Sequence, residues 1–482
     1  MKLLSSDRLS PILVKELRQG IRSKLFLGAF LTIQLSLFLY GTTLLMTGNN
    51  VGGDRGVELA FFWSAIVLPL LILVPAMASQ GIGKEITGKT LDLLLLTRIS
   101  SYRLVLGKWA SVIVQSTLLV TSALPYLMLR YFLGGIDIWN ELQSFAILLL
   151  ASALLAGITM GFWATKVSKF IKWVGVLVFL WLGPYMFVVL IVSRRGVTST
   201  GSGTGLVIWV YAFIATLMML ALAASRIGPP AENHSTQIRI LALVAAGAGL
   251  MFSGAQDLEV VSAILAILIL VPSIFGALTE KVRALPRLYA PFLNRTRLVR
   301  WISFPLSPGW PGGVAFTCLV LSLAPWFPLW FGEFRLAVFI AVAAMFLFPA
   351  ALVRSFLRPQ RQTLGPYLLV VALLTIPIYI WGAARAFDSA SVVFVVECVV
   401  GLFPPVALAL ELSEPSGYSG TVAVLEGLLV LIWSLLALVR AARVEWRTVE
   451  SLLMSPMPPM PLQEPVAIST APAAAPAEVS AS

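Results

Sequence analysis

Residues 59–79 read LAFFWSAIVLPLLILVPAMAS and contain no charged side chain. A bilayer core about 30 Å thick is crossed by roughly 20 apolar residues in a helix, because backbone amides in lipid must hydrogen-bond within their own segment. The stretch therefore predicts a membrane-spanning helix. The whole chain has a similar character, since 59% of its 482 residues are hydrophobic and only 12% are charged. This composition excludes a water-soluble fold.

Comparable apolar runs recur along the chain between charged or Gly/Pro-rich breaks. The predicted spans cover residues 25–46, 59–79, 109–131, 142–163, 173–192, 206–224, 238–253, 260–278, 314–330, 334–352, 367–384 and 422–439. A further apolar run, 392–410, contains Pro404 and Pro405, whose rings disrupt a helix interior, and we interpret it as re-entrant or interfacial. The predicted fold class is an all-α polytopic membrane protein of about twelve transmembrane helices.

Basic residues predict the orientation of these spans, because Lys and Arg near span ends stay in the cytoplasm. With twelve crossings and a cytoplasmic N-terminus, 28 of the 34 basic residues lie inside; a crossing at 392–410 lowers this to 25. We therefore expect both termini in the cytoplasm of a bacterial inner membrane. The net charge of +12 is spread over every inside loop, which indicates orientation and anionic lipid contact, not nucleic-acid binding.

The chain divides into four predicted regions. Residues 1–24 form a cytoplasmic amphipathic helix, 25–225 a six-span unit, 226–447 an accessory membrane module of about six spans, and 448–482 a disordered Pro/Ala-rich tail. The first apolar run has no cleavage site after it and is read as a retained span. Cys318 and Cys398 lie in separate apolar runs, which is typical of small buried residues and indicates neither a disulfide nor a metal site.

A helix is predicted ahead of the first span. Ser10 and Pro11 form a typical helix start, with proline in the first turn. One face carries the apolar residues Leu13 or Val14, Leu17, Ile21 and Leu25, and the other carries Lys15, Glu16, Arg18, Gln19 and Arg22. We expect this helix to lie in the cytoplasmic interface with its basic side chains near lipid phosphates. The alternative is an ordinary basic flank that only orients the first span.

A second short element is predicted in the cytoplasmic loop after the second span. Residues 81–109 read GIGKEITGKTLDLLLLTRISSYRLVLGKW, and their middle, 90–96, is strongly apolar but too short to span. This pattern favours a short amphipathic helix under the bundle that exposes Glu85, Lys89 and Asp92 to a cytoplasmic partner. The alternative is a loop helix that contacts only its own chain.

These two segments together resemble the permeases of type-two ABC transporters. Members of that family often begin with a Pro-x-x-x-Lys-Glu helix followed by Arg, and carry Glu, Gly-x-Thr-Leu, a leucine run, a turn and Gly-Lys after the second span. The matching positions are Pro11, Lys15, Glu16 and Arg22, then Glu85, Gly88, Thr90, Leu91, Leu94, Ile99, Ser100, Gly107 and Lys108. Arg98 stands where the family usually has Pro. The resemblance covers about the first half of the chain.

The resemblance implies an exporter-type permease that couples to a separate ATPase. The loop would be the coupling helix, contacting the nucleotide-binding subunit through Glu85, Gly88, Thr90, Leu91, Asp92, Leu94, Ser100, Gly107 and Lys108. ATP and magnesium would bind to that partner, so no cofactor is expected on this chain. A second permease chain, identical or different, would complete the assembly.

The same loop also matches the phosphate-loop pattern G-x-x-x-x-G-K-[ST] at residues 83–90. We reject nucleotide binding there, because a phosphate loop needs a preceding buried strand and a following helix to converge its amides on the phosphates. Here a membrane span precedes the pattern.

Two other classes of function remain as alternatives. An ion-driven secondary transporter should place paired carboxylates or broken helices at the midplane of both halves, and no such symmetry is visible. Glu397, Glu426 and Arg130 are the ionisable residues in or beside apolar runs. An intramembrane enzyme would need a convergent catalytic set, and His234, the only histidine, is interpreted as part of a solvated linker.

Overall fold

The fold is described from a computed structural model of the chain. It describes residues 11–47, 55–87, 100–133, 137–164, 202–229, 232–252, 258–283, 285–293, 296–323, 336–357, 365–374 and 418–454. Within these ranges the regular structure is entirely helical, in agreement with the predicted fold class. Helices are expected in a lipid bilayer, because the hydrocarbon core offers no hydrogen-bond partners and a helix pairs its own backbone N–H and C=O groups.

The helices follow one another along the chain with short turns between several of them. They are α1 (Pro11–Ile21), α2 (Lys24–Thr47), α3 (Arg55–Leu68), a π-helical turn (Pro69–Leu73), α4 (Val74–Thr87), α6 (Ser101–Leu133), α7 (Ile138–Ala164), α9 (Ser202–Ile227), α10 (Ser235–Phe252), α11 (Glu259–Thr279), α12 (Pro286–Leu293), α13 (Arg297–Ser303), a 3-10 turn (Phe304–Leu306), α14 (Trp310–Leu323), α15 (Leu336–Phe356) and α19 (Tyr418–Met454).

Eight helical segments in the described ranges are long and apolar enough to cross a membrane, or nine if the bent α13–α14 pair counts as one span. They are Lys24–Thr43, Phe61–Gly81, Ser101–Phe132, Ile138–Ala164, Gly205–Ile227, Ser235–Phe252, Val261–Thr279 and Gly427–Arg447. Each overlaps a predicted span. The predicted span at 173–192 lies outside the described residues, as do the ends of 314–330 and 367–384, so the total of twelve stays a prediction. The apolar run 392–410, interpreted as re-entrant or interfacial, also lies outside them.

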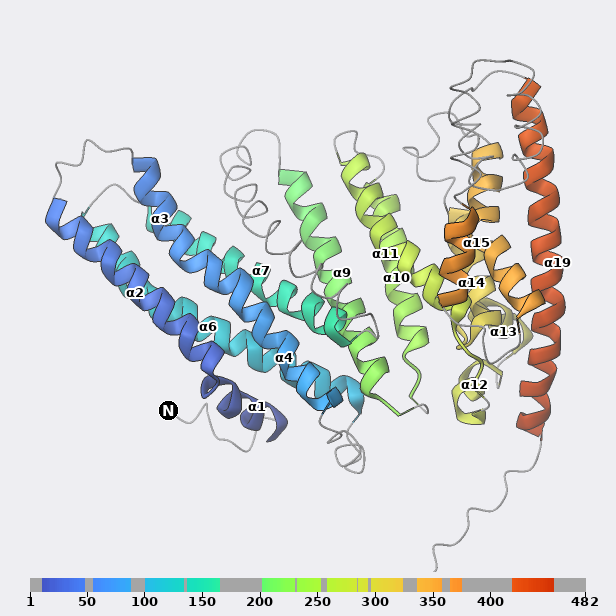
Figure 1. Ribbon diagram of the computed structural model, residues 1–482, viewed down its shortest axis with the longest axis horizontal. Coiled ribbons are helices and arrows are strands. Elements are labelled where there is room, and N and C mark those ends of the chain that lie inside the picture. Colours follow the sequence, from blue (N-terminus) through green and yellow to red (C-terminus); the bar gives the residue numbers. More distant parts are fainter. Residues whose placement is uncertain are drawn as a thin grey trace, which may run out of the picture.

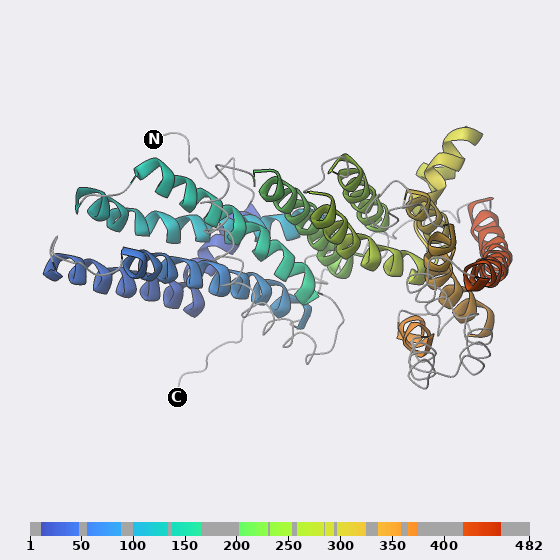
Figure 2. The same cartoon turned by 90° about the horizontal axis from the view of Figure 1, so that it is seen from above.

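The helices stand side by side in an elongated bundle (Figure 1). Helices α2, α3, α4, α6 and α7 share one core, α9 to α11 form the middle, and α14, α15 and α19 form the other end of the row. Figure 2 shows the same order from above. Helix α9 contributes Leu220 and Ala224 to the first core and Tyr211 and Met218 to the middle one, so it joins the two halves.

Close packing between α7 and α9 depends on two glycines spaced four apart. A Cβ at Gly157 would collide with Thr216, and one at Gly161 would collide with the backbone of Met219. Small residues at this spacing let two membrane helices approach until their backbones touch, which replaces the hydrophobic driving force that lipid does not supply. Thr216 also donates a hydrogen bond to the carbonyl of Leu154 across this contact, at 3.1 Å.

The second span is interrupted by a π-helical turn at Pro69. In a π turn the carbonyl of residue i accepts from the amide of residue i+5. For Leu70 that position is Pro75, which has no N–H to donate. The buried hydroxyl of Ser152 on α7 donates to the Leu70 carbonyl instead, at 3.1 Å. The irregular turn is therefore satisfied by a neighbouring helix, as it must be within a bilayer.

Candidate functional site at the basic end of the bundle

One end of the bundle gathers α1, the C-terminal ends of α4, α9 and α19, and the short helix α12 (Figure 1). Among the described residues, basic side chains that were assigned to the inside lie on α1 (Lys15, Arg18), at the end of α9 (Arg226) and near the end of α19 (Arg440, Arg443, Arg447). The polar side chains of this end form three assemblies, and each is described in turn.

In the first assembly, α1 is attached to α6 by an ion pair. Lys108 Nζ lies 3.0 Å from Glu16 Oε2, and the two side chains are only 5% and 17% exposed. Leu13, Val14 and Leu17 are half-buried, whereas Lys15 and Arg18 are exposed. The predicted apolar face is thus buried in part, since Ile21 is 40% exposed. Glu16, which the sequence placed on the polar face, is turned toward α6.

The loop between the second and third spans is shorter than the predicted 81–109. Helix α4 continues to Thr87 and α6 already begins at Ser101, so Glu85 lies in the last turn of α4. Gly107 and Lys108, expected to open the third span, lie near the second turn of α6. The apolar run marks only the part of α6 that hydropathy detects; Lys is a good helix former, so the helix extends beyond that run, and Lys108 is paired there with Glu16.

Several residues assigned to ATPase coupling cannot be placed. Gly88, Thr90, Leu91, Asp92 and Leu94 lie outside the described residues, as does most of the predicted coupling helix. Ser100 directly precedes α6, and its carbonyl accepts from the amide of Leu104 at 3.2 Å. Pro11 opens α1, and Arg22 directly follows it. The structure thus brings Glu16 and Lys108 together among the predicted site residues.

The phosphate-loop match is helical over its first residues. Positions 83–87 belong to the continuous helix α4. A phosphate loop has an open backbone whose amides point inward at the anion, and helical amides are already committed to the carbonyls of the preceding turn. This geometry agrees with the rejection of a nucleotide pocket there.

The second assembly corrects the interpretation of His234 as solvated. His234 is 7% exposed, and its Nε2 lies 3.0 Å from Ser101 Oγ and 3.0 Å from Glu232 Oε2. Ser101 also donates its hydroxyl to Glu232. The short chain between α9 and α10 is therefore folded onto the start of α6. Sequence reasoning missed this because the two segments are far apart in the chain and the polar residues have no periodicity.

Ser101, His234 and Glu232 resemble a catalytic triad in composition but not in geometry. In a serine hydrolase, the serine and the carboxylate contact opposite nitrogens of the imidazole. Here both contact Nε2, while Nδ1 lies 3.5 Å from Gln237 Oε1. Because the hydroxyl proton of Ser101 is directed at Glu232, the imidazole is not placed to remove it.

The arrangement instead caps α6. The backbone amide of Ser101 lies 3.3 Å from both carboxylate oxygens of Glu232. An acidic group at this position accepts from an amide that has no partner within the helix, and it interacts favourably with the positive end of the helix dipole. Gly228 permits the close approach, because a Cβ there would collide with the Ser101 hydroxyl.

The third assembly is centred on Arg239, which is 2% exposed near the start of α10. Its Nη2 lies 2.8 Å from Glu280 Oε2 and 2.8 Å from the Gly309 carbonyl, and its Nη1 donates to the carbonyls of Pro305 and Ser307. A guanidinium has five N–H donors in a fixed plane, so a single Arg can satisfy several acceptors at once. Arg239 thereby fixes the turn that leads into α14.

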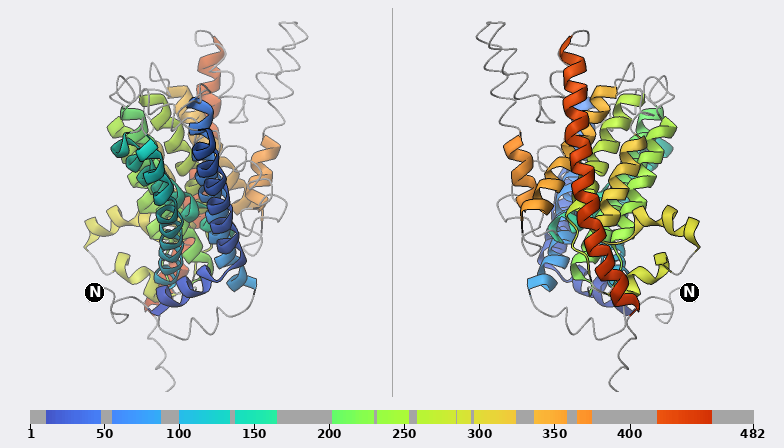
Figure 3. Two further views of the ribbon diagram at one scale, coloured as in Figure 1. Left: turned by 90° about the vertical axis from the view of Figure 1, so that its left-hand side faces the viewer. Right: turned by 90° about the vertical axis from the view of Figure 1, so that its right-hand side faces the viewer.

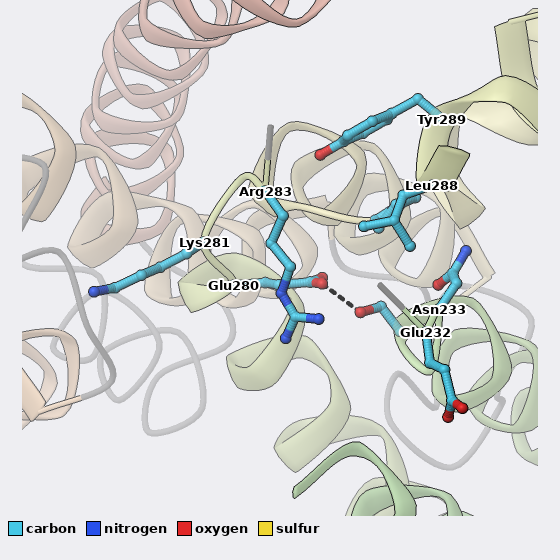
Figure 4. Close-up of a pocket in the computed structure, with 9 residues that line it drawn as sticks. Glu232, Asn233, Glu280, Lys281, Arg283, Leu288 and Tyr289 are labelled. Atoms are coloured by element: carbon cyan, nitrogen blue, oxygen red, sulfur yellow. Dashed lines mark hydrogen bonds between the residues drawn. The ribbon is translucent and has the colours of Figure 1, made fainter. Parts of the chain in front are cut away.

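A small pocket opens between the second and third assemblies (Figure 4). Its lining residues are Glu232, Asn233, Ser235, Glu280, Lys281, Arg283, Leu288, Tyr289 and Pro308. Figure 4 shows Glu280 hydrogen-bonded to the neighbouring hydroxyl of Ser235, with Arg283 beside it. Burial, with a further contribution from Glu280, raises the pKa of Tyr289 to about 12, so this phenol is neutral at physiological pH.

Aromatic contacts extend this end to the last helix. The guanidinium of Arg354 lies 4.4 Å from the Trp310 ring centre, and the Trp310 indole donates to Glu445 on α19. Trp446 makes edge contacts with Tyr289 and Phe304. Contacts at this end of the bundle therefore include α19 as well as α1, α6, α10 and the turn before α14.

The opposite end has one described ion pair between membrane helices, Arg130 with Glu141, at 3.8 Å. The guanidinium of Arg130 also lies 4.6 Å from the Phe62 ring centre. This pair explains how Arg130 is tolerated near a span end. Glu397 lies outside the described residues, and the side chain of Glu426 is not described.

No known protein family, no curated protein and no solved structure matches this chain. Among the described residues, no group of three or more His, Cys, Asp or Glu side chains could hold a metal ion. The apolar helices suggest a membrane-embedded protein, and this is the class to which the fold assigns the chain.

Proposed function

We propose that this chain is the membrane-spanning permease subunit of an ATP-driven ABC exporter, and that a separate ATPase binds the cytoplasmic face at residues 85–100. The resemblance of Pro11, Lys15, Glu16 and the following loop motif supports the proposal. ATP and magnesium would be bound by the ATPase, and a second permease chain would complete the assembly. The basic end of the bundle would face the cytoplasm of a bacterium, with both chain termini on that side.

One observation carries the mechanical part of the proposal, namely that the first turns of α6 are attached on two sides. Lys108 connects α6 to α1, and Ser101 connects it to the chain between α9 and α10. A force applied to residues 88–99, which precede α6, would therefore reach α1 and the second half of the molecule together. Coupling requires such a contiguous physical connection between the ATPase contact and the transport helices.

The test is capture of the partner from native membranes. The full-length tagged chain should co-purify with a nucleotide-binding ATPase, and the double variant Glu85→Lys, Asp92→Lys should lose that partner while inserting into the membrane in normal amounts. Asp54→Lys, a charge reversal at the residue that precedes α3 in the sequence, is the control and should retain it.

Two results would contradict the proposal. One is ATP hydrolysis by the purified chain alone, which would move the nucleotide site onto this protein. The other is labelling of residues 88–99 by a membrane-impermeant reagent added outside intact cells, since a docking surface for an ATPase must face the cytoplasm.

An ion-driven secondary transporter is less well supported. Among the described residues, the buried pair Arg130–Glu141 is a candidate for binding a coupling ion, but it joins the last turn of α6 to the first turn of α7. Coupling sites of secondary transporters lie near the bilayer midplane, so a pair at helix ends does not favour this function.

A further inference from the structure

Helix α13 leaves the bundle and exposes apolar side chains. It belongs to a segment that is bent by 93° from α14. In Figure 3 the short helices between α11 and α14 extend sideways from the upright helices, at the same end as α1. The exposed fractions are 77% for Leu298, 78% for Trp301 and 76% for Ile302. Such exposure of large apolar side chains indicates an interaction surface.

The helical positions of these residues define two faces. At about 100° per residue, Trp301, Leu298 and Ile302 fall within an arc of roughly 100°. Arg300, also exposed, lies on the far side of that arc, and Arg297 lies beside Trp301 on the helical wheel. A narrow apolar face with a tryptophan at its edge and a basic residue on the opposite side is typical of a helix lying in a membrane interface.

The charge of the surrounding segment is uniformly positive. Between residues 281 and 303 there are six Lys or Arg residues and no Asp or Glu. Basic residues near a bilayer are attracted to anionic lipid by about 1 kcal/mol each. This charge complementarity, together with the apolar face, selects an anionic lipid surface as the occupant.

We propose that α13 is an in-plane interfacial helix that binds anionic phospholipid. Its apolar face enters the headgroup boundary, and the positive charge of residues 281–303 attracts anionic lipid to it. The helix continues directly into the turn whose carbonyls at Pro305, Ser307 and Gly309 are held by Arg239. Lipid contact at α13 is therefore connected to the polar assemblies that reach the start of α6.

The experiment uses the full-length chain in phospholipid vesicles. In a Cys318→Ala, Cys398→Ala background, a cysteine replaces Leu298 and is labelled with an environment-sensitive fluorophore. The matched control carries the label at Val299, which is exposed and lies about 100° around α13 from Leu298. Quenching by doxyl-labelled lipid is compared between pure phosphatidylcholine and phosphatidylcholine mixed with phosphatidylglycerol.

The label at position 298 should be quenched several-fold more than the label at 299, and more strongly when phosphatidylglycerol is present. Arg297→Gln and Arg300→Gln should each reduce the preference for phosphatidylglycerol by about fivefold, the equivalent of about 1 kcal/mol. Both variants retain the apolar face of α13, so they test the attraction to lipid charge separately from the burial of apolar side chains.

Three outcomes would overturn the proposal. The labels at 298 and 299 could be quenched equally, or phosphatidylglycerol could have no effect. The label at 298 could also be shielded from both lipid and aqueous quenchers while residues at 298 cross-link between molecules, which would assign this face to a second copy of the chain.

Discussion

The two cation assemblies at the basic end of the bundle differ in how firmly they hold their surroundings. Arg239 contacts one carboxylate and three backbone carbonyls from a position that is almost fully buried. Lys108 makes one ion pair with Glu16 and a long contact of 3.5 Å to the Gly81 carbonyl. A planar guanidinium fixes several acceptors, whereas an ammonium acts as a point charge on a flexible stem.

The difference between the Arg239 and Lys108 assemblies indicates where the molecule is able to move. The Arg239 assembly joins α10, α11 and the turn before α14 into one unit, and its rearrangement would leave several buried acceptors unpaired. The Lys108 assembly joins α1, α4 and α6, next to the proposed ATPase contact, and the flexible stem of Lys108 lets the ammonium shift while it stays beside Glu16. We expect conformational change to be concentrated at the second assembly.

The largest expected effect is that of Arg239→Met. It leaves Glu280 and the carbonyls of residues 305–309 buried without their partner, so we expect a loss of about 3–5 kcal/mol in stability. Thermal unfolding of the purified protein in detergent measures it. Arg226→Gln, which replaces an exposed arginine of α9, should change stability by less than about 0.5 kcal/mol. If Arg239→Met and Arg226→Gln lowered stability equally, Arg239 would not hold its surroundings as firmly as its contacts indicate.

A pair of glycine substitutions sharpens the same contrast. A Cβ at Gly313 would collide with the backbone of Ala277, so Gly313→Ala must separate α14 from α11 and should cost about 1–3 kcal/mol. A Cβ at Gly20 would meet only the flexible end of Gln115, which can turn aside. Gly20→Ala should therefore be close to neutral in the same unfolding assay. A large loss of stability would contradict the expectation that the contact between α1 and α6 can adjust to an added methyl group.

Charge reversal tests the ion pair of α1. Glu16→Lys and Lys108→Glu each place like charges together and should each lose about 2 kcal/mol, within the range for charged hydrogen bonds. The double variant should recover part of this loss, because it restores opposite charges. A double-mutant cycle on unfolding gives the interaction energy, and strictly additive losses would mean that the two side chains do not interact.

The smallest effect is expected at the start of α6. Ser101→Ala removes one of the contacts made by Glu232 and His234, while the backbone amide of residue 101 remains capped, so we expect a loss of about 1 kcal/mol. Glu232→Gln should cost more than Ser101→Ala, because it also removes the favourable interaction with the helix dipole. Hydrogen exchange of the first turn of α6 provides the readout, and unchanged protection in both variants would argue against this cap.

The sequence by itself determined the class of protein and the position of the helices. Uncharged runs such as 59–79 can bury their amides in lipid only as helices, so hydropathy is sufficient to find them. It also determined that α1 has one apolar face, since the helical period is local. The extent of α6 could not be found in this way, because the charge of Lys108 makes its first turns read as loop.

Only the tertiary structure decided which polar residues meet. Lys108 is read as a loop residue until Glu16 lies beside it, and His234 is read as solvated until the start of α6 covers it. Lys108 and Glu16 are 92 positions apart in the chain, and Ser101 and His234 are 133 positions apart. Such pairs leave no periodic trace, because the physical reason for their burial is a partner supplied by another helix.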